Sequence, residues 1–126
     1  MKAFWISATI LLALFLILCL HVRYLREFVE PLHTQLAMAA QLAQGNEWQA
    51  AEVATCAVYD AWDERRTYLH ITLRHTDLDS IYLSLEEVFA YLRKREIGEY
   101  MAANQMLITK LTLLYEMEAF SLRNVL

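Results

Sequence analysis

Residues Ala3–Val22 read AFWISATILLALFLILCLHV, an unbroken apolar run with no ionised side chain. A helix rises about 1.5 Å per residue, so a run of about 20 residues spans roughly 30 Å, the thickness of a bilayer's hydrocarbon core. Trp5 lies near one end of the run and Tyr24 follows the other end. Aromatic side chains of this kind concentrate at the two membrane interfaces. The run therefore predicts one membrane-spanning helix at the N-terminus.

Two other interpretations of this run stay open. A cleaved signal peptide would have a shorter apolar core and small residues before the cleavage point, whereas Leu20, His21 and Val22 are bulky. Lipid attachment at Cys19 would require small residues directly before the cysteine, whereas Leu16, Ile17 and Leu18 are large. The sequence therefore favours an uncleaved signal anchor.

The charges that flank the run indicate its orientation only weakly. Lys2 and the terminal amine stand on one side of the run, and Arg23 and Arg26 stand on the other. The positive charge on the two sides is therefore nearly equal, and the positive-inside rule alone does not decide the orientation. A short, positively charged N-terminal tail that stays inside is typical of signal anchors. We therefore expect a single-pass protein of the cell membrane with residues 23–126 on the extracytoplasmic side.

Beyond the run, about a hundred residues remain, enough for one modest core. Two glycines and one proline in the whole chain leave few turn residues for a sheet. We therefore expect an all-α fold. Residues 1–30 would form the membrane anchor and a juxtamembrane helix, and residues 31–126 a small antiparallel bundle of about four helices.

All fifteen acidic residues lie beyond Val22, and this part of the chain is net acidic. Such a domain does not neutralise phosphates, so nucleic acid is excluded as a partner. Cys19 lies inside the apolar run and Cys56 lies outside it. We therefore expect no disulfide, no metal site and no cofactor.

Proline, glycine and capping residues set the expected helix boundaries. Pro31 is expected to end the first helix and to begin the second, because proline lacks an N–H. Gly45 is expected to end that second helix in a turn. Asn46 and Gln49 resemble a capping box, so a third helix should start there and continue to about Arg74.

The next helix is expected to be capped by Thr76 or Asp77 and to end in basic residues 93–95 before Gly98. A last helix over about 99–119 would leave residues 120–126 as a tail. Helical spacing of apolar residues predicts the core, which we expect to comprise Leu32, Leu36, Ala39, Ala43, Ala51, Ala54, Val58, Trp62, Leu69, Leu78, Ile81, Leu85, Val88, Phe89, Leu92, Met101, Leu107, Ile108, Leu111, Leu114 and Tyr115.

Four residues are candidates for a functional surface: Trp62, His75, Asp79 and Glu118. Trp62 becomes a contact anchor for a partner if it is exposed, and is otherwise core. His75 and Asp79 lie at an expected helix start, where capping accounts for them and metal binding or catalysis is the alternative. Glu118 continues an apolar stripe, and a buried carboxyl group there would need a partner or a raised pKa. His70 should point away from His75 on a continuous helix. No residue is predicted to be catalytic.

The chain also resembles an uncharacterised bacterial family of small single-pass membrane proteins that is described only as a domain of unknown function. The resemblance lies in Trp62, in His75 followed by Asp77, Leu78, Asp79 and Ile81, and in the closing phrase Glu118-Ala119-Phe120-Ser121-Leu122-Arg123-Asn124. Asp77 stands where the family pattern often has Glu. The resemblance implies one N-terminal anchor and a helical region of about a hundred residues, and it implies no reaction.

Three functions are compatible with these observations. The first is a non-enzymatic interaction or scaffold protein that binds another membrane or envelope protein, or itself. The second is a ligand-sensing bundle that signals through a partner. The third is an enzyme that acts on lipid or the cell wall. Because no Gly-rich phosphate loop, HExxH or CxxC motif occurs, we expect the first function and no enzymatic activity.

Overall fold

The structure is a computed structural model that describes residues 1–125, without the side chains of Ser121, Leu122 and Val125. The described part of the chain is helical: α1 (Lys2–Gln44), α2 (Trp48–Glu64), α3 (Arg66–Thr72), α4 (His75–Lys94) and α5 (Ile97–Val125). No strand occurs within it. The predicted all-α fold is confirmed.

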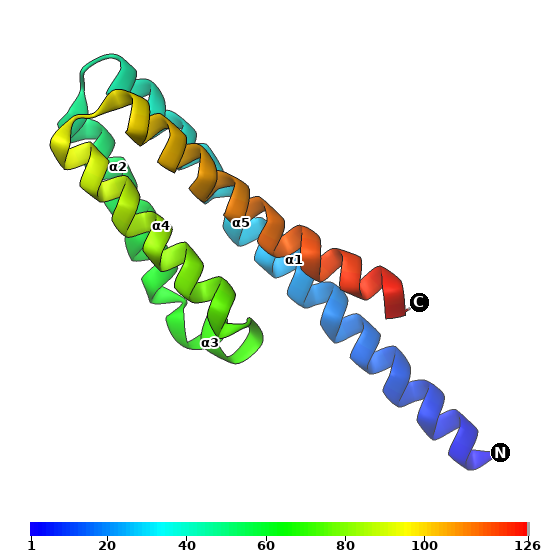
Figure 1. Cartoon of the computed structure of the whole chain (residues 1–126). Helices are drawn as coiled ribbons and strands as arrows, with labels where there is room; N and C mark the ends of the chain where they lie inside the picture. Colours follow the sequence, from blue (N-terminus) through cyan, green and yellow to red (C-terminus); the bar gives the residue numbers. More distant parts are fainter. Residues whose placement is uncertain (126) are drawn as a thin grey trace.

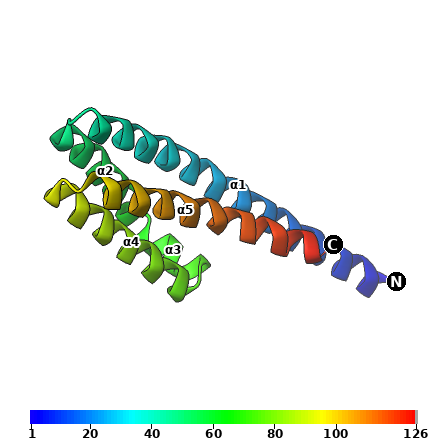
Figure 2. The ribbon, with the colours of Figure 1, turned by 45° about the horizontal axis from the view of Figure 1, so that its top comes forward.

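The four long helices form an antiparallel bundle. α1 packs against α2 and α5, and α4 packs against the same two helices from the other side. The short helix α3 lies at the corner between α2 and α4 (Figure 1). The first turns of α1 project beyond the bundle, and the C-terminal end of α5 lies beside α1 in both views (Figure 2). An apolar N-terminal helical segment is thus followed by a helical bundle, as the sequence predicts.

Pro31 does not interrupt α1, so the predicted helix end before residue 30 is wrong. Proline in a helix interior removes one hydrogen bond and crowds the preceding turn, at a cost of about 3 kcal/mol. Here Pro31 is exposed, whereas Val29 and Leu32 on either side are buried in the bundle. Packing of the flanking turns therefore holds the helix together across the proline.

The turn between α1 and α2 lies where the sequence predicts it, but the expected capping box does not form. Gly45 is the C-cap of α1, and Asn46 adopts a left-handed conformation with φ of 63°. Asn tolerates this region better than most residues. Glu47 is the N-cap of α2 and makes no side-chain capping bond. Asn46 is thus a turn residue and not a cap.

The ends of α4 also differ from expectation. Arg74 is the N-cap, without a side-chain capping bond, so the helix starts before Thr76 and Asp77. Asp77 lies in the first turn, where its charge offsets the helix dipole. At the other end Arg95, with φ of 55°, takes the left-handed position expected of a glycine. Gly98 instead lies inside α5.

Two further boundaries differ from the predictions. The helix expected to run to about Arg74 ends at Glu64, and α3 follows as a separate short helix. The expected tail is helical, because α5 extends to Val125. Leu126, the end of the predicted tail, lies outside the described residues.

The predicted core is confirmed, with most of its members buried and Phe89, Met101 and Tyr115 partly buried at its edge. Other core members were not predicted, some of them because they fall within residues 1–30, the expected anchor and juxtamembrane helix. They include Leu25, Phe28, Val29, Leu73, Tyr100, Ala103 and Asn104. The core therefore begins within the segment that leaves the apolar run.

Candidate functional site

Trp62 is a core residue. Its side chain is fully buried and stacks on Phe28, with ring centroids 5.9 Å apart. The ring of Tyr82 packs against the indole in a T-shaped arrangement, with centroids 6.4 Å apart. Its indole Nε1 has no hydrogen-bond partner among the described residues. In this conformation Trp62 presents no surface to a partner.

A polar and aromatic cluster joins the end of the apolar run to α3. His21 Nδ1 lies 2.7 Å from the Tyr68 hydroxyl, and the rings of Tyr24 and Tyr68 pack edge to face at 4.9 Å. Arg65 donates from Nε to the Tyr24 hydroxyl at 3.0 Å, and its guanidinium lies 4.5 Å from the centre of the Phe28 ring. Burial, with a smaller contribution from Tyr24, raises the pKa of Tyr68. These contacts fix α3 against α1.

The chain brings His70 and His75 together, contrary to the expectation that they diverge. Their ring centroids lie 5.4 Å apart. The reason is the break between α3 and α4, because the two residues lie on different helices that meet at a corner. Within residues 1–125, no group of three or more His, Cys, Asp or Glu side chains has the geometry to hold a metal ion.

Glu118 lines a groove between α4 and α5 with a volume of about 160 Å³. Arg74, Asp77 and Lys110 line the same groove, so two cations and two carboxylates face a common space. Lys110 is held there by a hydrogen bond from Nζ to the buried Ser84 hydroxyl at 2.7 Å. Asp79 is exposed and lies outside the lining. Of the adjacent acidic residues, the structure therefore places Asp77 in the groove.

The apolar side of this groove continues along α5. Leu113 and Met117 line it, and both are exposed, as is Met106 seven residues before Leu113. Residues 106, 113 and 117 recur at helical spacing, so they lie on one face of α5. Leu83 on α4 is a further exposed apolar residue. We call Met106, Leu113 and Met117 the α5 stripe.

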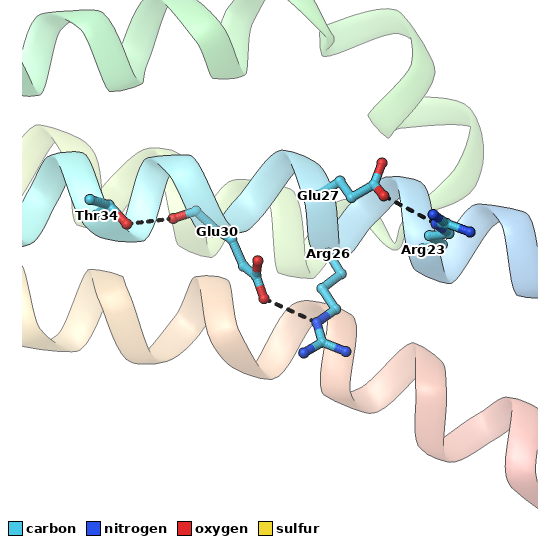
Figure 3. Close-up of polar contacts among 5 residues, drawn as sticks. All are labelled: Arg23, Arg26, Glu27, Glu30 and Thr34. Atoms are coloured by element: carbon cyan, nitrogen blue, oxygen red, sulfur yellow. Dashed lines mark hydrogen bonds and ion pairs between the residues drawn. The ribbon is translucent and has the colours of Figure 1, made fainter.

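A second hollow of about 330 Å³ lies between α1 and α5, lined by Val29, Glu30, His33, Thr34, Thr112 and Tyr115. On its α1 side, Arg26 Nε pairs with Glu30 at 3.0 Å, and the Thr34 hydroxyl donates to the Glu30 carbonyl oxygen at 3.2 Å (Figure 3). Arg23 and Glu27 form a similar pair at 3.1 Å. All four charged side chains are exposed, so these pairs contribute little stability.

The N-terminal part of α1 is the remaining feature. Its most apolar stretch of 18 residues has a mean hydropathy of 2.6, and none of these residues is buried inside the bundle. By length and composition this helix is a candidate membrane span. A buried helix of a soluble core would instead be covered by its neighbours.

The fold therefore defines a class: an antiparallel helical bundle whose first helix extends into an uncovered apolar segment. The chain belongs to the family described as Domain of unknown function (DUF4363), which matches residues 19–125. The match begins in the last turn of the apolar run and includes the whole bundle. No curated protein and no solved structure matches the chain. The resemblance to a family of unknown function is confirmed.

Proposed function

We propose that this protein is a single-pass membrane protein whose bundle stands at the membrane surface and binds a second membrane or envelope protein. The observation that carries the proposal is the continuity of α1. Its uncovered apolar part and its buried part, from Leu25 to Ala43, belong to one helix. A bundle attached in this way keeps a fixed height and tilt relative to its anchor, as a scaffold or docking subunit requires.

The α5 stripe supports a protein partner. Met and Leu side chains exposed along one helix face are typical of interaction surfaces, because Met adapts its shape to the partner. The candidate residues for chemistry support a non-enzymatic role, because they do not meet. His75 pairs with His70 and does not line the groove that Glu118 lines.

The membrane part of the proposal is tested by fractionation. Leu12→Arg should weaken retention in the membrane fraction, because an Arg near the centre of a span costs about 2.5–3.5 kcal/mol. Val53→Arg, at an exposed position of α2, is the control and should leave retention unchanged. Wild-type protein recovered in the soluble fraction would overturn the proposal. A reporter fused at the C-terminus tests the proposed extracytoplasmic side.

The partner part is tested by crosslinking in intact cells. A photoreactive residue in place of Met106 or Leu113 should yield an adduct with one second protein, and the same residue in place of Val53 should not. Val53 is a suitable control because it is also an exposed apolar residue. Adducts that contain only this protein, or equal adducts at all three positions, would contradict the proposal.

A further inference from the structure

We infer that the end of the bundle nearest the anchor contacts the lipid bilayer directly, through Ile71 on α3 and Phe120 on α5. This inference rests on the proposed function, since it assumes that α1 spans the membrane. It adds a second kind of partner, the headgroup layer of the same bilayer.

The position of α3 follows from its contacts with α1. Tyr68 bonds His21 and packs on Tyr24, and these two residues stand at the end of the apolar run. Tyr24 is two residues beyond Val22, or about 3 Å along the helix axis. The headgroup region extends about 5–7 Å beyond the hydrocarbon core on each side. Tyr68 therefore lies at the level of the headgroups.

Ile71 follows Tyr68 by three residues on the same short helix. Ile71 is 79% exposed, the largest exposed fraction among the large apolar residues beyond the anchor whose side chains the structure describes. The structure thus places an uncovered branched side chain at the corner of the bundle beside the end of the apolar run. His70 and His75 lie at the same corner and supply polar groups for the headgroup layer.

Phe120 reaches the same level from α5. Tyr115 on α5 and Glu30 on α1 line one hollow, so they stand at similar heights. α5 runs antiparallel to α1, and Phe120 is five residues, or about 7.5 Å, closer to the membrane than Tyr115. That places Phe120 near the level of Tyr24 and Leu25. Figures 1 and 2 show this end of α5 beside α1. Phe120 is 63% exposed.

The chemistry of the two side chains suits lipid. Apolar and aromatic side chains partition into the boundary between headgroups and acyl chains, and the gain scales with the apolar area that leaves water. The part of the chain beyond Val22 is net acidic, so attraction to anionic lipid does not drive the contact. We therefore expect the contact to form on membranes of zwitterionic lipid, which carry no net charge, and to be insensitive to salt.

The experiment uses the full chain with Cys19→Ser and Cys56→Ser, reconstituted in phosphatidylcholine vesicles. Spin labels are attached at Ile71→Cys and Phe120→Cys, and collisions with oxygen and with a water-soluble nickel complex report the depth of each label. Val53→Cys is the matched control, because Val53 is 64% exposed. Val53 lies nine residues before Trp62 on α2, and this places Val53 about 13 Å farther from the membrane than Trp62. Leu11→Cys is the reference inside the anchor.

We expect the labels at residues 71 and 120 to show an oxygen-to-nickel collision ratio several-fold above that of residue 53. Ratios equal to that of residue 53, with the label at residue 11 in lipid, would overturn this inference and leave the proposed function standing. Protection from both reagents would indicate a protein neighbour and would also overturn it. If the label at residue 11 is in water, both proposals fail together.

Discussion

The ring of Phe28 stacks on the indole of Trp62, with centroids 5.9 Å apart and planes inclined by 23°. Phe28 lies on α1, only six residues beyond the apolar run, and Trp62 lies on α2. Leu25 and Val29 are buried beside it. The segment that follows the apolar run is therefore also part of the bundle core.

Phe28→Ala should destabilise the bundle by about 3–5 kcal/mol, because it leaves a cavity against Trp62. Phe4→Ala changes the same side chain on the same helix, but Phe4 lies in the uncovered part of α1, so this control should leave stability unchanged. Denaturant unfolding of the full chain in mild detergent, followed by tryptophan fluorescence, measures both. Equal midpoints for the two variants would contradict a core that includes Phe28.

Pro31→Ala should stabilise the protein by about 2 kcal/mol, because it restores a helical N–H and removes the clash with the preceding turn. The gain is less than the full cost of proline, because proline also restricts the unfolded chain. Pro31→Gly restores the same N–H but costs about 1 kcal/mol in helix propensity. The expected order of unfolding midpoints is Ala above Gly above wild type. An unchanged midpoint for Pro31→Ala would show that the helix bears no cost at this position.

The faces of the helices were predictable from the sequence because burial follows helical periodicity. Leu78, Ile81 and Leu85 on α4 are spaced by three and four residues, and all three are buried. The burial of Phe28 was not predicted, because Pro31, three residues later, indicated a helix end and so placed Phe28 in the expected juxtamembrane helix outside the bundle. Local signals of this kind lose to packing when both flanking turns are buried.

The candidate site was less predictable because it depends on how helices meet. Asp77 and Glu118 are far apart in sequence, and only the pairing of α4 with α5 brings them to one groove. The proximity of His70 and His75 required the break between α3 and α4, which no glycine or proline marks. Sequence periodicity places residues on faces, but it does not place one face against another.

Arg95→Gly and Gly98→Ala should each stabilise the protein. Arg95 has φ of 55°, a conformation that costs a residue with a Cβ about 1–2 kcal/mol and costs glycine little.

Gly98 lies in helix α5, and a Cβ built there meets no atom within 4 Å. Alanine in its place should add about 0.5–1 kcal/mol. Thermal unfolding checks both variants, and a loss of stability for Arg95→Gly would contradict the left-handed helix end.

Tyr100 should make stability fall at high pH. Its side chain is fully buried, and burial raises its pKa to about 12 from 10.0. Below pH 10 the folded and unfolded states both hold the proton, so Tyr100 adds no pH dependence. Between pH 10 and 12 only the unfolded state loses it, and stability falls by about 1.4 kcal/mol per pH unit. Tyr100→Phe should reduce this slope in unfolding curves measured across that range, and an unchanged slope would exclude Tyr100 as its source.

The contact between His21 and Tyr68 should couple the apolar part of α1 to the bundle. The two side chains approach to 2.7 Å, and a hydrogen bond of this kind contributes about 0.5–1.5 kcal/mol. A double-mutant cycle with His21→Ala and Tyr68→Phe isolates the pairwise contribution, which should be of that size in full-length protein in detergent. Arg23 and Glu27 form an exposed pair on the same helix and provide the comparison, since a cycle between them should give about 0.3–0.5 kcal/mol. A coupling energy of zero between His21 and Tyr68 would mean that α3 is held against α1 by the other contacts, which are the packing of Tyr68 on Tyr24 and the contacts of Arg65 with Tyr24 and Phe28.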